Sequence, residues 1–191
     1  MGRLSKEQVR ENIFDAVVQI TAEKGVGATS MADVARTAKV SAGTLYLHFE
    51  SKEAMLQATY LYLKRKFYHS LRQEQASQSP RAVVEGVWRD LVNFLCQQPN
   101  AFLFLETAGA AQLLTEEQRA EIEPYQEELS GLIQSSINAE AGEEVSLNVA
   151  LNLLIGSAMH LARRNALSSE PRNEAEVSET FLRVWRSLVT K

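Results

Sequence analysis

VARTAKVSAGTLYLHFESKEAML, residues 34–56, is the stretch that decides the fold. It predicts two short helical segments joined by a tight turn, and the small residue Ala35 lies four positions before the turn at Lys39. Ser41 is placed to cap the second segment as a helix. A small residue at the crossing, a tight turn and a short capped second helix are the layout of a helix-turn-helix, whose second helix can enter the major groove of DNA.

The second helix of this motif has an inward side and an outward side. Leu45 and Phe49 are spaced to anchor it to a core, while Val34 and Val40 supply the apolar contacts that fix the crossing angle. The residues left facing outward are Ala42, Thr44, Leu47 and His48. Alanine and threonine can touch a thymine methyl group, and threonine can also hydrogen-bond a base edge.

Other polar groups around the motif are suited to the DNA backbone. Tyr46, His48 and Lys52 can contact phosphates. The N-terminus of the preceding helix, capped by Thr29 or Ser30, presents free N–H groups to a phosphate. Each residue taken singly is also explained as a surface polar group without a role, but their combination at this spacing predicts DNA binding.

The rest of the chain reads as helical, because apolar residues recur at helical spacing and no strand pattern appears. A capping box at Thr115 and Gln118 should open an acidic helix that Pro124 kinks or breaks. We expect an all-α protein of about nine helices. Five have expected spans, which are Ser5–Lys24, Thr29 or Ser30 to Ala38, Pro80–Cys96, Ser146–Asn165 and Asn173–Val189. The other four begin near Ser41, Ser51, Pro99 and Thr115.

Residues 13–56, which are 44 of the 191, resemble the N-terminal domain of the tetracycline-repressor (TetR) family of bacterial transcription regulators. The matching positions are Ile13, Ala16, Gly25, Thr29, Val34-Ala35, Ala38, Val40-Ser41, Gly43, Leu45-Tyr46, Phe49, Lys52-Glu53 and Leu56. The resemblance implies a three-helix DNA-binding domain over residues 1–50 and a helical domain over 51–191 that dimerises and binds an effector. Members of this family commonly act as repressors.

Carried over by position, the resemblance implies a set of DNA-facing residues, to which the turn and cap residues Lys39 and Ser41 are added. These DNA-binding candidates are Thr29, Lys39, Ser41, Ala42, Gly43, Thr44, Tyr46, His48 and Lys52. The expected partner is double-stranded DNA with a palindromic operator, which requires a two-fold symmetric protein.

The chain departs from the family pattern at two positions. The family usually has glycine where this chain has Lys39, and a left-handed residue other than glycine costs about 1 kcal/mol. We expect either a phosphate contact that offsets this cost or a turn that differs locally. The family also usually has an aromatic residue four positions before Gly25, where this chain has Thr21.

Charge and composition agree with a regulator that binds DNA at one end. The net charge is −4, but residues 1–66 carry +3 and residues 67–191 carry −7. A basic end would face DNA and an acidic remainder would be repelled by it, although +3 also lies within ordinary scatter. The single cysteine, Cys96, and the absence of an apolar signal segment indicate a reducing compartment, the cytoplasm.

The uncharged stretch from Val145 to Ala162 is long enough to raise the question of a membrane span. Because it contains two asparagines, two serines and His160, we interpret it as a helix buried on nearly all sides and expect no membrane association. Pairing of this helix with the last helix across a two-fold axis would bury both, and a helix enclosed within one subunit is the alternative. The predicted dimer interface comprises Leu147, Leu151, Ile155, Ala158, Phe181, Trp185 and Leu188.

A small-molecule effector of unknown identity is expected among the middle helices. The candidate pocket residues are Tyr60, Leu63, Phe67, Trp88, Leu91, Leu95, Phe102, Leu105, Glu106, Leu129 and Met159. Each apolar one is equally explained by core packing. Glu106 would bind a cationic effector if it were buried, and solvent exposure or pairing with an arginine is its alternative role.

Catalysis is not expected. The three histidines show no spacing for metal ligands, Cys96 has no neighbouring histidine, and no glycine-rich phosphate loop is present. We therefore expect no cofactor and no metal. Two other functions stay open at this point: a TetR-like regulator without a small-molecule effector, and an activator in place of a repressor.

Overall fold

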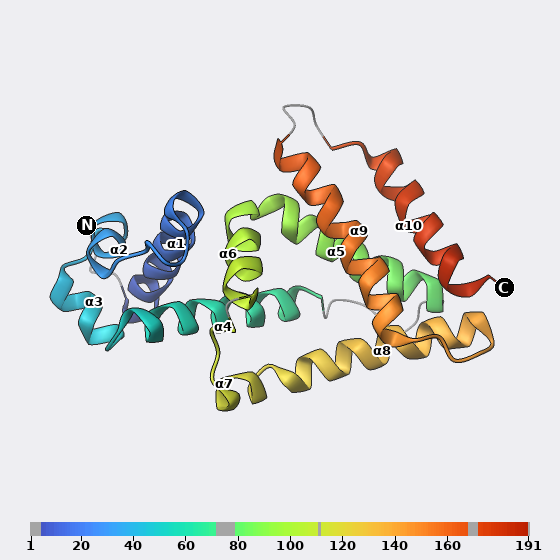
Figure 1. Ribbon diagram of the computed structural model, residues 1–191, viewed down its shortest axis with the longest axis horizontal. Helices are drawn as coiled ribbons and strands as arrows, with labels where there is room; N and C mark the ends of the chain where they lie inside the picture. The colour runs from blue at the N-terminus through green and yellow to red at the C-terminus, as the bar shows by residue number, and fades with distance from the viewer. Residues whose placement is uncertain (1–4, 72–78, 111, 168–171, 191) are drawn as a thin grey trace. The chain divides into compact units, whose positions relative to one another are not determined.

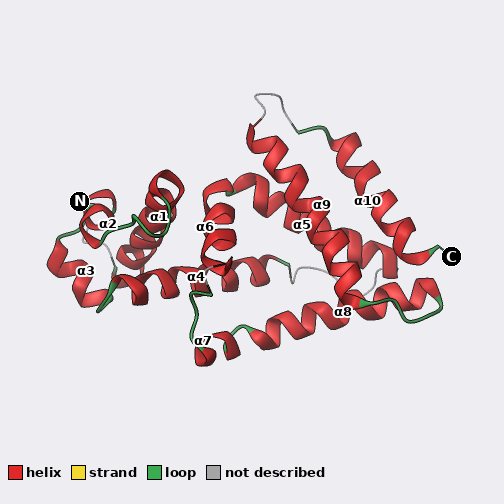
Figure 2. Ribbon diagram, in the orientation of Figure 1, coloured by secondary structure: helices red, strands yellow, loops and turns green. Residues whose placement is uncertain are grey.

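The computed structural model describes residues 5–71, 79–110, 112–167 and 172–190, and this part of the chain is all-helical (Figures 1 and 2). It contains ten α-helices and no strand among the described residues. Their bounds are α1 Lys6–Lys24, α2 Met31–Thr37, α3 Ala42–His48, α4 Lys52–Ser70, α5 Pro80–Gln97, α6 Pro99–Ala110, α7 Glu116–Ala120, α8 Glu123–Ala141, α9 Leu147–Leu167 and α10 Glu174–Val189. The all-α prediction is therefore confirmed.

The tenth helix arises where a proline was expected to break the chain's helical course. Thr115 and Gln118 form the expected capping box, since each backbone N–H donates to the other's side chain, at 3.1 and 3.2 Å. Helix α7 ends at Ala120, and α8 begins at Glu123 with Pro124 in its first turn. Proline lacks the N–H that a continuous helix needs, but it fits a first turn, so the acidic segment forms two helices.

Helix α1 starts and stops where the sequence indicates. Ser5 and Gln8 form a capping box at its N-terminus. At its end Gly25 adopts φ +84°, and its N–H donates to the carbonyl oxygen of Thr21 at 2.8 Å. A side chain at that backbone geometry would be strained, so glycine ends α1 without cost and turns the chain toward α2.

The chain divides into two compact units, the first comprising Met1–Arg65 with Asn100–Arg119 and the second Lys66–Pro99 with Ala120–Lys191. Helix α4 contributes to both, because its residues up to Arg65 belong to the first unit and those from Lys66 to the second. This division by packing leaves the functional boundary at residue 50 a prediction.

The core of the first unit joins α1, α2 and α3 to α4 and α6. Its fully buried side chains include Ile13, Val17, Val34, Leu45, Met55 and Phe104. The Phe14 ring lies 5.9 Å from the Phe49 ring and 4.6 Å from the Tyr62 ring, between centroids. The three N-terminal helices therefore share one core with α4, and Phe14 of α1 contacts Tyr62 of α4 directly.

Trp88 of α5 is the centre of the second unit's core. Its indole N–H donates to the carbonyl oxygen of Leu154 at 2.9 Å and to Ser157 Oγ at 3.2 Å, both on α9. Its ring lies 5.5 Å from that of Phe181 on α10. The inner face of α10, which is Val177, Phe181, Trp185 and Leu188, is buried in the same core.

No helix in the described part of the chain combines the length and the apolar character of a membrane span. Helix α9, which carries no charge up to Ala162, lies instead against α5 and α10 in the second unit (Figure 1). Its side chains Val149, Leu153 and Ile155 are exposed.

Candidate DNA-binding surface

The turn between α2 and α3 is left-handed at Lys39, which is one of the two alternatives left open above. Ser30 caps α2 by accepting the N–H of Asp33 at 3.1 Å. Lys39 then adopts φ +56°, and the N–H of Val40 donates to the carbonyl oxygen of Ala35 at 3.0 Å. Lysine thus occupies a conformation that favours glycine, so the turn is not rearranged around it.

Helix α3 is a single short helix held by one side. Ser41 Oγ accepts the N–H of Thr44 at 3.0 Å and lies 2.8 Å from Thr44 Oγ1, which caps the helix. Leu45 is fully buried and Phe49, which follows the helix, is buried as well. Two apolar anchors and a cap therefore position the seven residues.

The other side of α3 is open to solvent. Tyr46 is 58% exposed and Leu47 is 86% exposed, and both are large side chains that the chain leaves without packing. Ser41, Ala42 and Gly43 are exposed, whereas Thr44 and His48 are half-buried. This exposed face is the geometry that a groove-reading helix needs, and the contribution of each residue to DNA contact remains a prediction.

Gly43 is not required by the chain's own packing. A Cβ atom built there would meet only Ser41 Oγ, at 3.8 Å, and no positive φ constrains the position. Glycine inside a helix lowers its stability by about 1 kcal/mol relative to alanine. An unhindered, exposed glycine is accordingly suited to the close approach of something outside the chain.

Two of the predicted DNA-facing residues are engaged inside the protein. The Thr29 side chain is buried, and its hydroxyl donates to the carbonyl oxygen of Gly25 at 3.0 Å. Lys52 Nζ donates to the carbonyl oxygen of Gly27 at 2.7 Å. Thr29 therefore orders the segment before α2 from within, while Lys52 is half-buried and tied to that same segment.

Asp33 forms ion pairs with two basic residues at the α1–α2 junction. Its carboxylate is 3.0 Å from Lys24 Nζ, and it also pairs with Arg36 and accepts a hydrogen bond from Ser30 Oγ. The hydrogen bond from Lys24 is the main cause that lowers the pKa of Asp33. Two of the positive charges near the motif are thus already neutralised.

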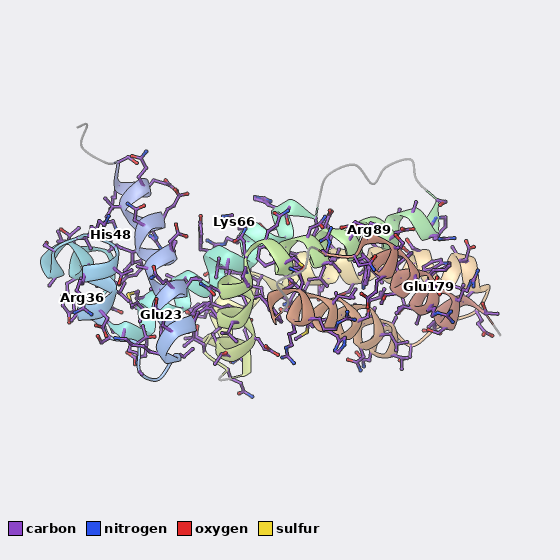
Figure 3. The ribbon with its side chains drawn as sticks, turned by 90° about the horizontal axis from the view of Figure 1, so that it is seen from above. Glu23, Arg36, His48, Lys66, Arg89 and Glu179 are labelled. Atoms are coloured by element: carbon purple, nitrogen blue, oxygen red, sulfur yellow. The ribbon has the colours of Figure 1, made fainter. Side chains whose placement is uncertain are left out.

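A second basic group was not anticipated from the sequence. Lys6 and Arg10 on α1 lie near His48, and partial burial together with these two positive charges lowers the pKa of His48. Figure 3 shows His48 and Arg36 at the same end of the first unit, on α3 and α2. The signal that could have revealed the pair is its spacing of four residues, which places both side chains on one face of a helix.

The predicted pocket residues are distributed over both units. Leu63, Trp88 and Leu95 are fully buried core residues. The half-buried ones are Tyr60, Phe102, Leu105 and Glu106 in the first unit, and Phe67, Leu91, Leu129 and Met159 in the second. Half-buried side chains can still contact a ligand. Four apolar candidates of this kind lie in the second unit and three in the first. No cluster of metal-ligating side chains occurs within the described ranges.

The predicted dimer residues fall into an inward and an outward group. Phe181, Trp185, Leu188 and Ala158 are buried inside the second unit, where side chains of the same subunit cover them. Leu147 and Leu151 are half-buried, and Ile155 is 42% exposed. The amphipathic face of α10 is used within the subunit because Trp88 and α9 cover it.

Comparison with known proteins gives one family for the N-terminal part of the chain. Residues 13–59 match the model of bacterial regulatory proteins of the tetR family. The chain is 29% identical over 98 residues to an uncharacterised HTH-type transcriptional regulator of Haemophilus influenzae, which covers 51% of this chain and 52% of that protein. The chain therefore spans about half the length of this relative.

Two further proteins are similar over nearly the whole chain. The HTH-type transcriptional regulator YvdT of Bacillus subtilis is 25% identical over 184 residues, covering 94% of this chain and 95% of that protein. A crystal structure of a TetR family transcription regulator from Marinobacter aquaeolei superposes with a TM-score of 0.84, at 22% identity, covering 95% of both chains. At that identity the structural likeness shows the fold alone.

Proposed function

Because the chain belongs to the TetR family of DNA-binding transcription regulators, which are not enzymes, we propose that it acts as a dimeric repressor released from a palindromic operator by a small molecule. The observation that carries the proposal is the exposed face of α3, where Tyr46 and Leu47 are left unpacked beside Gly43. Ala42 and Thr44 read base edges, while Tyr46, His48 and Lys39 contact phosphates.

The two reading helices of a dimer must match one turn of DNA, about 34–36 Å apart. We place the dimer contact on the outer side of α9, where Val149, Leu153 and Ile155 are 52%, 39% and 42% exposed. Gly156 lies on the same exposed side, and a Cβ there would meet nothing within 4 Å. Small and apolar side chains together allow the close approach of a second α9, and burial of this patch supports self-association.

The dimer is tested by replacing Leu153 and Ile155 together with glutamate. The expected result is a monomer in analytical ultracentrifugation at micromolar concentration, with an unchanged helical circular dichroism spectrum. Replacing Gly131 and Ser135 of α8, which are also exposed, by glutamate is the matched control and should leave the dimer intact. A wild-type chain that sediments as a monomer would contradict the proposal.

Helix α4 is the element through which an effector acts on the DNA-binding helices in this proposal. It carries Lys52, bonded to Gly27 before α2, and it continues as far as Ser70 in the second unit. Gln57 of α4 also donates to the carbonyl oxygen of Leu113 at 3.1 Å. The effector must bind one arrangement of α4 better than the other, since otherwise no equilibrium shifts.

The whole proposal is tested in two steps. Selection of bound duplexes from a random DNA pool should enrich a palindrome of two half-sites, and enrichment of no sequence would overturn DNA reading by α3. A thermal-shift screen of small molecules against the protein should then identify compounds that stabilise it. A stabilising compound that also releases the selected DNA supports the repressor mechanism, whereas DNA binding that no stabilising compound alters favours a regulator without an effector.

A further inference from the structure

Lys6 and Arg10 form a basic stripe on α1 that no ion pair neutralises within the described part of the chain. The two residues are four positions apart, so their side chains leave the same face of the helix. Neither forms an ion pair with any described residue. The basic residues at the other end of this region differ, because Lys24 and Arg36 both pair with Asp33.

The acidic residues of α1 lie on a different stripe. Glu7, Glu11 and Asp15 also recur every four residues, one position after the basic ones. Tyr62 of α4 faces this acidic stripe, since its hydroxyl lies 3.5 Å from Glu11 and the pKa of Tyr62 is raised by burial and then by Glu11 and Asp15. Glu11 and Asp15 therefore lie near Tyr62, and none of the three acidic residues forms an ion pair with Lys6 or Arg10.

Arg10 is held in place by aromatic rings rather than by a carboxylate. Its Cζ atom lies 5.4 Å from the centroid of the Phe14 ring and 5.4 Å from that of the Phe49 ring. Guanidinium groups stack on aromatic faces and keep their N–H donors for a further ligand. A stacked arginine loses less conformational freedom on binding an anion than a freely moving one does.

The basic stripe and α3 meet at the end of the reading helix. Arg10 stacks on the ring of Phe49, and Phe49 follows His48 in the chain. The rings of His48 and Phe49 lie 6.1 Å apart. The pKa of His48 is lowered first by its partial burial and then by the positive charges of Lys6 and Arg10. The positive charges of Lys6 and Arg10 oppose protonation of His48, and an anion bound between the three side chains would favour it.

We propose that Lys6, Arg10 and His48 bind a phosphate group of the DNA backbone, so that α1 takes part in DNA contact beside the bases read by α3. A backbone phosphodiester fits because arginine donates to two phosphate oxygens at once and lysine adds a point charge. This inference rests on the proposed function, in which α3 enters the major groove. It adds a contact that the helix-turn-helix pattern does not contain.

The test compares Lys6→Gln and Arg10→Gln with Lys24→Gln. All three remove one positive charge from the same helix, but Lys24 is paired with Asp33. Dissociation constants for the DNA duplex enriched by selection are measured between about 50 and about 200 mM salt, where each phosphate contact contributes about 0.9 to the logarithmic slope. Because a dimer presents this phosphate contact once in each subunit, each of the first two variants should lower the slope by up to about 1.8, which is up to about a 12-fold change in the affinity ratio to wild type across that range.

Lys24→Gln should leave the slope at its wild-type value. An unchanged slope in Arg10→Gln, or an equal fall in Lys24→Gln, would overturn the inference, because the effect would then be absent or a matter of net charge. Arg10→Lys keeps the charge and should keep the slope, while binding more weakly than wild type because the planar guanidinium is lost. Thermal midpoints of each variant identify any loss of folding, and a wild-type chain that enriches no DNA would instead overturn the proposed function.

Discussion

The hydroxyl oxygens of Thr21 and Thr29 lie 3.1 Å apart in the interior of the first unit, and they connect the end of α1 to the segment before α2. Thr29 Oγ1 uses its proton on the carbonyl oxygen of Gly25, at 3.0 Å, so Thr21 donates to Thr29. This pair explains how a polar residue fits where the family pattern has an aromatic one. It also explains why Thr29 is buried rather than exposed to DNA.

Replacing Thr29 by valine should destabilise the protein more than replacing Thr21. Thr21→Val removes one hydrogen bond, whose net contribution is about 1 kcal/mol, whereas Thr29→Val removes two and leaves the Gly25 carbonyl unpaired. Urea unfolding measures the difference. Thr107→Val, at an exposed position of α6, is the control and should change the free energy of unfolding by less than about 0.5 kcal/mol. Equal effects of all three variants would contradict this account of the pair.

Replacing Lys39 by glycine should stabilise the fold and weaken DNA binding. The φ of +56° is strained for lysine, and glycine relieves about 1 kcal/mol of that strain, less the flexibility it adds to the unfolded chain. The melting temperature should rise by a few degrees, while the loss of a phosphate contact lowers the salt slope of DNA binding. A variant that gains stability and keeps the wild-type salt slope would show that Lys39 contacts no phosphate.

Replacing Gly43 by alanine separates folding from DNA contact. Because nothing in the chain opposes a Cβ there, Gly43→Ala should stabilise the protein by up to about 1 kcal/mol. The added methyl group should nevertheless reduce affinity for the selected duplex at least tenfold if a groove wall approaches this position. Gly131→Ala on α8, where a Cβ also meets nothing within 4 Å, should give the same stabilisation with unchanged DNA affinity. Unchanged affinity in both variants would remove Gly43 from the contact surface.

DNA affinity should increase as the pH falls from about 7.5 to about 5.5. Burial, Lys6 and Arg10 lower the pKa of His48 in the free protein, so it is neutral at pH 7. A bound phosphate raises that pKa, which means that the complex takes up a proton and is favoured at lower pH. His48→Gln should flatten the dependence when dissociation constants are measured at constant ionic strength. An equally steep dependence in this variant would assign the proton to another group.

Local signals in the sequence predicted most of the fold because each acts within a few residues. The Thr115–Gln118 capping box and the break at Pro124 depend only on neighbouring backbone groups, and both occur in the structure. The left-handed geometry at Lys39 was one of two alternatives that the family resemblance left open, and the structure has it. Such features need no knowledge of how the helices pack.

Features that depend on packing between distant residues were not predictable in this way. The period of α10 marked Phe181, Trp185 and Leu188 as one apolar face, but not that the face packs inside the subunit against Trp88. The exposure of Thr29 could not be judged without its partner Thr21. The proximity of Lys6 to His48, 42 residues later in the chain, is set by the packing of the first unit and not by either segment alone.

The way α3 is held has a consequence for how this protein can acquire new targets. Its attachment depends on Leu45, Phe49 and the Ser41 cap, while Ala42, Tyr46 and Leu47 take no part in packing. Substitutions at these three positions can therefore accumulate, by mutation or by engineering, with little loss of folding stability. Operator preference can diverge between descendants of this chain while the scaffold that carries it stays unchanged.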